Sequence, residues 1–269
     1  MSPSDDELFP AAPPRKVALV VEYDGTMYAG FQLQANACTI QGELEQAIAR
    51  LTQERVRIHG AGRTDAGVHA LGQVAAFTTG SCLPCDTLVK GLNHFLPQGI
   101  SVREAYDVPL AFDPRRHARS RTYRYTILSH ATPSPLRERY AYRMAEPLDH
   151  QAMSVALRWL EGTHDFGPLS GPVPAGKSTV RHIMSTALCK DNDLVYFEVE
   201  GNAFLPHQMR RIAGLLVAVG TGRASPEAAC AIMSGHTSPD LARRASVTLP
   251  AHGLCLMKVK YEDFPPNAY

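Results

Sequence analysis

The chain has few features that would set it apart from ordinary globular proteins. Its 269 residues include one tryptophan and six cysteines, 45% are hydrophobic, and the formal net charge is only +1. The longest apolar run, residues 212–219, is far shorter than the roughly 20 residues that a membrane-spanning helix needs. These absences exclude a fibrous, strongly charged, wholly disordered or membrane-spanning chain and predict a soluble folded protein of one or two domains.

The N-terminus and the cysteines give little sign of export or of a metal. Residues 1–14 lack the basic start and apolar core of a signal peptide, so we expect a disordered tail on a cytoplasmic chain. Only Cys82 and Cys85 form a CxxC pair, with no second pair, which favours free thiols over a zinc site. None of the eleven histidines forms a short ligand motif, and we predict no metal.

Positive charge is concentrated in one segment, although the whole chain is nearly neutral. Residues 115–143 contain eight arginines and a single acid, Glu138, with four tyrosines interleaved. RNA-binding proteins use this mixture to hold phosphates and to stack bases. The alternative is a strand with a solvated basic face. On the first interpretation, Arg119 and Arg121 are candidate RNA contacts.

Hydrophobic periodicity predicts an α+β chain with two halves. In the first half, residues 15–112, the expected order is strand, helix, strand, strand, helix, strand, as in one ferredoxin-like unit. The second half, residues 113–269, has a similar order and includes a proline-rich loop at 167–176, which we expect to be mobile. The expected strands are 15–23, 56–59, 73–78, 100–106, 121–128, a hairpin within 182–200, and 254–261; the expected helices are 39–51, 85–96, 150–160, 206–220 and 226–234.

The most unusual segment is the glycine-rich loop at residues 60–70. Arg63 and Asp65 place opposite charges two residues apart among three glycines, which permit tight turns and close approach of a ligand. The GxGxxG fingerprint fails because Asp65 stands at its third glycine position. A hairpin loop with a solvated ion pair is one interpretation. The other is that Asp65 is a nucleophile, since a neighbouring guanidinium favours the charged carboxylate.

Four segments together resemble the TruA family of tRNA pseudouridine synthases. The octet at residues 62–69, with Asp65 at its centre, is similar to the family's signature. The other matching residues are Glu22, Tyr23, Asp24, Gly25, Gly30, Phe31 and Gln32; Arg121, Thr122, Tyr123, Arg124 and Tyr125; and Asn202, Ala203, Phe204, Met209 and Arg210. Phe31 stands where the family usually has tryptophan, and Pro206, His207 and Gln208 also depart from the usual pattern.

The resemblance implies a fold and an activity. The expected fold is two ferredoxin-like halves forming an extended, mainly antiparallel central sheet, with helices packed on one side and the active-site cleft between the halves. The expected activity is isomerisation of uridine to pseudouridine at positions 38, 39 and 40 of the tRNA anticodon stem-loop. No cofactor is implied, tRNA is the partner, and the family acts as a homodimer.

The resemblance also assigns roles to single residues. Asp65 is the nucleophile, attacking either C6 of the base or C1′ of the ribose. Tyr123 packs on the target base, Arg210 pairs with Asp65, and Arg63 is a candidate for holding the extruded backbone. For His207, near a helix start, we expect a phosphate contact.

Two rival functions remain. A non-catalytic tRNA-binding or tRNA-folding protein would need the basic segment and the tyrosines but not Asp65. A small-molecule enzyme that binds a nucleotide would need a complete phosphate-binding loop, which the sequence lacks.

Overall fold

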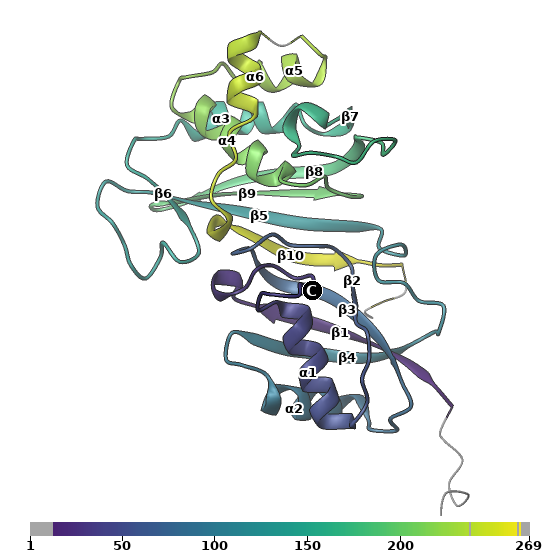
Figure 1. Ribbon diagram of the computed structural model, residues 1–269. Coiled ribbons are helices and arrows are strands. Elements are labelled where there is room, and N and C mark those ends of the chain that lie inside the picture. The colour runs from purple at the N-terminus through teal and green to yellow at the C-terminus, as the bar shows by residue number, and fades with distance from the viewer. Residues whose placement is uncertain (1–12, 237, 263, 265–269) are drawn as a thin grey trace, which may run out of the picture.

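A computed structural model describes residues 13–236, 238–262 and 264 of the chain (Figure 1). Residues 1–12 of the predicted disordered tail lie outside the described residues. Within the described part, all the strands join one ten-stranded sheet in the order β4-β1-β3-β10-β5-β9-β8-β7, with β2 beside β3 and β6 beside β5. The strands are β1 (Arg15–Tyr23), β2 (His59–Gly60), β3 (His69–Thr79), β4 (Ile100–Val108), β5 (Ser120–Ser129), β6 (Tyr142–Met144), β7 (Gly162–Asp165), β8 (Val180–Asp191), β9 (Leu194–Gly201) and β10 (Leu254–Lys260).

Helices cover the sheet in two groups (Figure 1). α1 and α2 lie against the β4-β1-β3 part, α3 and α4 lie against the part that contains β5, β9 and β8, and α5 and α6 pack on α3 and α4 farther from the sheet. The helices are α1 (Ile40–Thr52), α2 (Cys85–Phe95), α3 (His150–Arg158), α4 (Gln208–Gly220), α5 (Ala228–Met233) and α6 (Pro239–Ala245), with short 3₁₀ turns η2 (Gly25–Met27), η3 (Gly167–Leu169) and η4 (Ala251–Gly253). The predicted α+β fold, with a mainly antiparallel open sheet, is confirmed.

Alternation along β1 explains how the first half packs. Val17, Leu19 and Val21 are fully buried and join a hydrophobic core with the apolar stripe of α1, as period-2 and period-3.6 patterns require. The Thr39 side chain accepts a hydrogen bond from the Gly42 N–H and caps α1, as the sequence predicts. Burial of the alternating residues therefore fixes which face of β1 meets the helix.

The last strand, β10, lies in the middle of the sheet. It runs parallel to β3, with Cys255 opposite His69, and antiparallel to β5, with Leu256 opposite Tyr123. The strand that closes the chain thus joins the two halves. It also brings the start of β3 and the middle of β5 to either side of one strand, and the candidate site is built there.

Two expected boundaries were wrong because of contacts distant in sequence, and a third was wrong because of the local backbone conformation. β3 starts at His69 rather than at residue 73, since its first residues pair with β10. β2 has only two residues, because the backbone of Ile58 instead bonds to side chains of α1: its N–H donates to Glu45 and its carbonyl accepts from Gln41. Helix α4 begins at Gln208, two residues late, because His207 has a left-handed backbone with φ of 59°.

Three elements were missed: β6, β7 and α6. β6 and β7 have three and four residues, too short for a hydrophobic period to register.

The proline-rich loop that was expected at 167–176 contains the turn η3 at its start. Its Leu169 is fully buried in the core, so this end of the loop is anchored.

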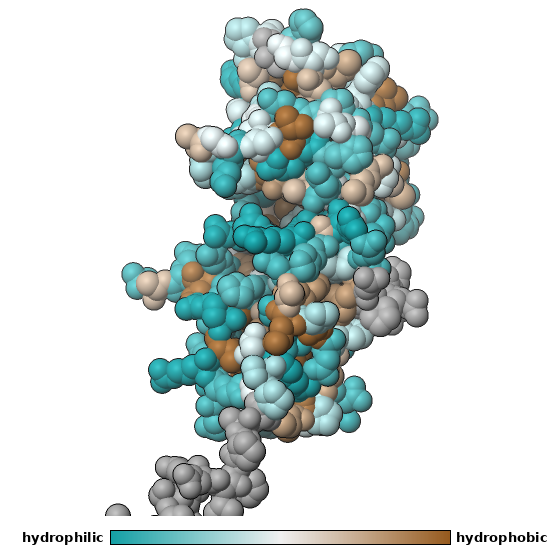
Figure 2. All heavy atoms as spheres, turned by 90° about the vertical axis from the view of Figure 1, so that its right-hand side faces the viewer, coloured by the Kyte–Doolittle hydropathy of each residue, from teal (hydrophilic) through white to brown (hydrophobic). Residues whose placement is uncertain are grey.

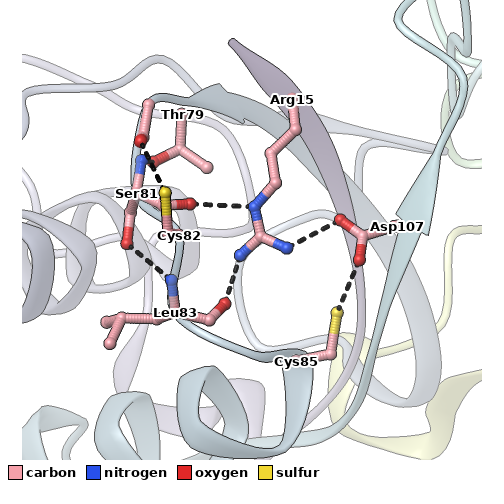
Figure 3. A network of polar contacts seen from close by, with 8 residues as sticks. Arg15, Thr79, Ser81, Cys82, Leu83, Cys85 and Asp107 are labelled. Carbon is pink, nitrogen blue, oxygen red and sulfur yellow. Dashed lines mark hydrogen bonds and ion pairs between the residues drawn. The ribbon is translucent and has the colours of Figure 1, made fainter. Parts of the chain in front are cut away.

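Arg15 ties together three segments at one end of the first half (Figure 3). Its guanidinium pairs with Asp107 at 2.8 Å, donates to the Ser81 carbonyl at 2.9 Å and also donates to the Leu83 carbonyl. The Cys85 thiol donates to the other oxygen of Asp107. All six cysteines are free thiols in this structure, and Cys82 and Cys85 take part in this network as separate hydrogen-bonding groups.

The surface of one side of the molecule is mostly hydrophilic, and its hydrophobic residues form small separate groups (Figure 2). None of the helices in the described part of the chain has the length and apolarity to cross a membrane.

Candidate active site

The glycine-rich loop, residues 61–68, connects β2 to β3 and is held by backbone contacts on both sides. The Ala61 N–H donates to the Val74 carbonyl at 2.7 Å, the Phe31 N–H donates to the Thr64 carbonyl at 3.1 Å, and the Gly67 N–H donates to the Tyr28 carbonyl at 3.3 Å. We call this segment the catalytic loop because it carries Asp65, the predicted nucleophile. Its contacts come mainly from the turn that follows β1, so the resembling segments at residues 22–32 and 62–69 lie side by side.

Two glycines of the turn after β1 permit this close approach. A Cβ at Gly25 would lie 2.0 Å from the Val68 carbonyl oxygen, and one at Gly30 would lie 2.6 Å from the Thr64 carbonyl oxygen. Gly30 also has φ of +96°, which side chains rarely adopt. No other residue type fits at these positions without moving the catalytic loop.

Asp65 meets Arg210 across 145 residues of sequence. Arg210 Nη1 lies 3.0 Å from Asp65 Oδ2, and His207 Nε2 lies 3.7 Å from the same oxygen. Arg210 is itself fixed, since its Nε donates to the Leu249 carbonyl at 2.7 Å. The carboxylate remains 37% exposed. It is therefore oriented by a fixed guanidinium and still accessible to a reacting group.

Tyr123 projects from β5 beside the same loop. Its side chain is 8% exposed and packs edge-on against Phe204, with ring centroids 5.0 Å apart. Its hydroxyl lies beside Gly62, where a Cβ would be 3.6 Å away. Burial, with the nearby Asp65 charge adding to it, raises the pKa of Tyr123 to about 12. At neutral pH the site therefore presents a neutral phenol next to a carboxylate.

A buried polar layer beneath the catalytic loop was missed by sequence reasoning. The Tyr23 hydroxyl shares a hydrogen bond of 2.8 Å with Thr64 Oγ1, and Gln73 Nε2 donates to the Gly62 carbonyl at 2.8 Å. Burial raises the pKa of the Tyr23 hydroxyl well above its usual range, so it stays protonated. The signal available in the sequence was a polar Gln73 in an otherwise apolar strand.

Arg121, a candidate RNA contact, lies inside the protein. Its side chain points into a buried position and donates to three backbone carbonyls: Asn202 at 2.7 Å, Ala61 at 2.9 Å and Arg115 at 2.7 Å. The residue is 8% exposed, and burial lowers its pKa. In this structure the guanidinium therefore donates to backbone carbonyls, one of which is at the start of the catalytic loop, and it does not face solvent where a phosphate could bind.

The rest of the basic segment is largely paired with acids. Within the described residues, six of its eight arginines form ion pairs: Arg116 with Asp113, Arg119 with Glu262, Arg124 with Glu198, Arg137 with Asp193, Arg139 with Asp24 and Arg143 with Glu138. Five of these acids lie outside the segment. In the folded protein, acids from other parts of the chain therefore neutralise much of the positive charge of residues 115–143. Arg119, 65% exposed, remains on the surface. Arg63 is exposed next to Asp65 and pairs with no described residue.

The proline-rich loop reaches the site through His207. The Gly171 N–H donates to the Pro206 carbonyl at 2.8 Å, and a Cβ at Gly171 would lie 3.0 Å from His207 Nδ1. The structure thus brings Asp65, Arg210, His207, Tyr123 and Arg63 together, with Arg121 behind the loop and Arg119 directly before the first residue of β5. The assigned roles of these residues stay predictions.

In the described part of the chain, this site coincides with neither a metal-ligating cluster nor the groove of about 780 Å³. No group of three or more histidine, cysteine or acidic side chains able to hold a metal occurs in the described ranges. The molecule does have a groove of about 780 Å³, but it is lined by residues such as Val20, Glu22 and Leu71, and Asp65, Tyr123 and Arg210 do not line it.

Known proteins match nearly the whole chain. A family model described as tRNA pseudouridine synthase matches residues 19–115 and 156–262. A tRNA pseudouridine synthase A from Pelobacter propionicus is 44% identical over 247 residues, which cover 92% of this chain and 100% of the relative. The proteins of that name from Geotalea uraniireducens and Roseiflexus castenholzii are 42% and 44% identical, covering 92% and 93% of this chain and 100% and 92% of their own lengths.

Solved structures give a weaker likeness. A chain from the structure of an H/ACA RNP bound to a substrate RNA containing 2′-deoxyuridine is 11% identical, and the match covers 76% of this chain and 44% of that chain. The TM-score is 0.37, below the level at which two folds are considered alike.

Proposed function

The chain belongs to the tRNA pseudouridine synthase family, and from that premise we propose that it converts uridine to pseudouridine at positions 38, 39 and 40 of the tRNA anticodon stem-loop, with Asp65 as the nucleophile. As a member of this family it is an isomerase. The observation that supports the proposed nucleophile is the ion pair of 3.0 Å between Asp65 and Arg210, beside Tyr123.

The reaction requires a base to leave the stacked stem. Flipping the uridine out of the stem costs a few kcal/mol of stacking free energy, and contact with an aromatic side chain such as Tyr123 partly offsets this cost. Asp65 attacks either C6 of the base or C1′ of the ribose, and the N1–C1′ bond breaks. The uracil turns and C5 bonds to C1′. The bond to Asp65 then breaks, either at C1′ as C5 displaces the carboxylate or at C6 as the adduct eliminates, and the C5 proton is lost while N1 gains one. No group enters from outside and no redox change occurs, so the chemistry needs no cofactor.

The site residues take distinct roles in this proposal. Arg210 orients the carboxylate. Tyr123, whose pKa of about 12 keeps it neutral at pH 7, contacts the base and passes on the C5 proton as a hydrogen-bonding group instead of acting as a phenolate. Arg63 and His207 border the carboxylate from the exposed side, and we assign them contacts to the RNA backbone.

We further propose that the protein works in the cytoplasm as a homodimer that holds the tRNA across both subunits. Light scattering at micromolar concentration, with and without tRNA, measures the oligomeric state. A monomer in both conditions would contradict the proposed dimer and leave the chemistry unaffected.

The decisive experiment compares wild type with Asp65→Asn, which keeps the shape of the side chain and removes its charge and nucleophilicity. We expect tritium release from C5-labelled uridine in whole tRNA to fall by at least about 1,000-fold, because the nucleophile is lost. The Kd for tRNA should stay within a few-fold, since no positive charge is removed. The modified positions are identified with tRNAs that each carry one C5-labelled uridine. We expect tritium release only when the label is at position 38, 39 or 40.

Two outcomes would contradict the proposal. Substantial turnover by Asp65→Asn would show that Asp65 is not the nucleophile. No release by the wild type, with tight tRNA binding, would favour the tRNA-binding or tRNA-folding protein.

A further inference from the structure

A segment of the second half reaches over to the first half. Residues 130–141, which we call the cross-half segment, connect β5 to β6 and extend from the sheet (Figure 1). Two of its side chains contact one residue of the first half. Arg139 lies with Nε 2.8 Å and Nη2 2.7 Å from Asp24 Oδ2, and the Tyr140 hydroxyl donates to the same oxygen at 3.1 Å. Asp24 and Arg139 are 115 residues apart in sequence.

Asp24 is placed to receive these contacts by its own turn. Its other oxygen, Oδ1, accepts from the Thr26 N–H at 3.0 Å and from the Thr26 hydroxyl at 2.6 Å, which caps the turn η2. The Asp24 N–H donates to the Gly99 carbonyl at 2.9 Å. Both carboxylate oxygens are therefore used, one within the first half and one toward the second half.

The turn η2 in turn holds the end of the catalytic loop. The Gly25 N–H donates to His69 Nδ1 at 3.1 Å, and His69 comes four residues after Asp65. Gly25 also lies so close to the Val68 carbonyl that no side chain fits between them. The Tyr140 ring packs edge-on against the His69 ring, with centroids 5.0 Å apart. A chain of direct contacts thus runs from Arg139 through Asp24 and η2 to the loop that carries Asp65.

The Asp24–Arg139 pair differs from the other ion pairs of the cross-half segment. The Asp24 side chain is only 18% exposed, and two nitrogens of Arg139 share its oxygen at hydrogen-bond distance. Arg137, equally exposed at 51%, reaches Asp193 at 3.5 Å, and Asp193 is 46% exposed and lies within the second half. Short contacts to a half-buried carboxylate are worth more than a long surface pair. Arg139 and Arg137 are therefore a matched pair of arginines with different expected effects.

We propose that Arg139 and Asp24 are positioning residues that latch the two halves together and hold the catalytic loop so that Asp65 meets its substrate. Neither residue touches the reacting atoms. The proposal rests on the proposed function for its kinetic effect, since a loop displaced by about 1 Å can cost about 100-fold in rate. It differs from the interpretation of residues 115–143 as an RNA-binding segment, because it assigns Arg139 to a contact within the protein.

The test compares Arg139→Gln, Asp24→Asn and the double variant with Arg137→Gln as the matched control. Asp24→Asn keeps an oxygen to cap Thr26 and loses only the charge. We expect each latch variant to lower the single-turnover rate at saturating tRNA by about 10- to 100-fold. The double variant should be no slower than the slower single variant, since both changes open the same contact. The Kd for tRNA should change less than threefold, and Arg137→Gln should behave as wild type.

A conservative variant separates positioning from general damage to the fold. Arg139→Lys keeps the charge and reaches Asp24 with one donor, so we expect it to recover most of the rate lost in Arg139→Gln. Hydrogen exchange of the peptide covering residues 61–69 gives a readout that needs no activity. It should speed up about tenfold in both latch variants and stay unchanged in Arg137→Gln.

The alternative role for Arg139 is a contact to an RNA phosphate, and it predicts different results. If Arg139 binds a phosphate, Arg139→Gln weakens tRNA binding and flattens its salt dependence, while Asp24→Asn frees the arginine and strengthens binding. That pattern, or unchanged hydrogen exchange of the catalytic loop in both variants, overturns the latch. A wild type without turnover would contradict the proposed function alone, because the exchange experiment still decides whether the latch exists.

Discussion

The two ends of the catalytic loop are held by arginines in different ways. At the first end, buried Arg121 donates to three neutral carbonyls, including that of Ala61. At the second end, half-exposed Arg139 pairs with Asp24, which holds the turn that contacts His69. A buried cation bonded to the backbone cannot be removed without leaving unsatisfied acceptors, whereas a pair formed by a half-exposed arginine can open and close. We therefore expect stability to depend on the first end and loop position on the second.

The largest expected effect on stability is at the first end. Arg121→Met removes the donor to three backbone carbonyls, of which that of Ala61 is in a buried contact, and should lower the free energy of unfolding by about 2 kcal/mol or more, measured by urea unfolding. Arg139→Gln, at the second end, should lower it by about 1 kcal/mol or less. If Arg121 contacts RNA instead, Arg121→Met keeps the stability of the wild type and reduces the salt slope of tRNA binding by about one. The comparison between the two ends would then be wrong.

The second end should also respond to acid. Burial works against ionisation of Asp24, but the hydrogen bonds from Thr26 and Tyr140 and the nearby His69 lower its pKa from 3.8 to about 2. A carboxyl with a lowered pKa in the folded state contributes stability above its unfolded value, and this contribution is lost as pH falls from about 4 toward 2. Relative to Asp24→Asn, the wild type should lose about 1 kcal/mol of stability by pH 3.

Urea unfolding of wild type and Asp24→Asn at pH 7, 5, 4 and 3 measures this difference. All other carboxyls are common to the two proteins, so their titration cancels. A difference that stays constant over this range would show that Asp24 does not lose its partners on unfolding in the way the structure indicates.

The two ends of the catalytic loop should also differ, by a smaller amount, in how salt changes their hydrogen exchange. At 1 M salt the screening length is about 3 Å, so the Asp24–Arg139 pair should weaken while the buried Arg121 contacts should not. We expect hydrogen exchange at Gly67 and Val68 to rise a few-fold between 0.05 M and 1 M salt, with Ala61 unchanged. Equal acceleration at both ends would mean that salt loosens the loop as one unit.

The smallest expected change in stability is at Arg119, an arginine of the same segment that holds neither end. Its side chain is 65% exposed and pairs with Glu262, so Arg119→Gln should change stability by less than about 0.5 kcal/mol. If it contacts a phosphate, the salt slope of tRNA binding should fall by about one. Arg103, 61% exposed and paired with Glu22 on the first half, provides the control. An unchanged slope in Arg119→Gln would place Arg119 off the RNA path.

Local patterns predicted most of the elements, because the core-facing periods of β1, α1 and β9 are strong and each period is set within one segment. Local patterns failed where a partner distant in sequence determines the bounds of a strand. β3 starts early because β10 pairs with it, and β2 is short because α1 side chains bond to the residues before it. Helix α6 follows no strong period, and its last turn contains exposed Arg243 and half-buried Arg244, so it was not recognised.

The candidate site shows the same division. The sequence by itself indicated Asp65, Tyr123 and Arg210, since a carboxylate in a glycine-rich loop and its resemblance to a signature depend on residue type and spacing. It could not give the positions of the arginines in residues 115–143, because five of the six acids that neutralise them come from outside that segment. Only the tertiary structure decided that Arg121 faces inward and that Arg139 meets Asp24, because burial and pairing of a long side chain depend on what the rest of the chain packs around it.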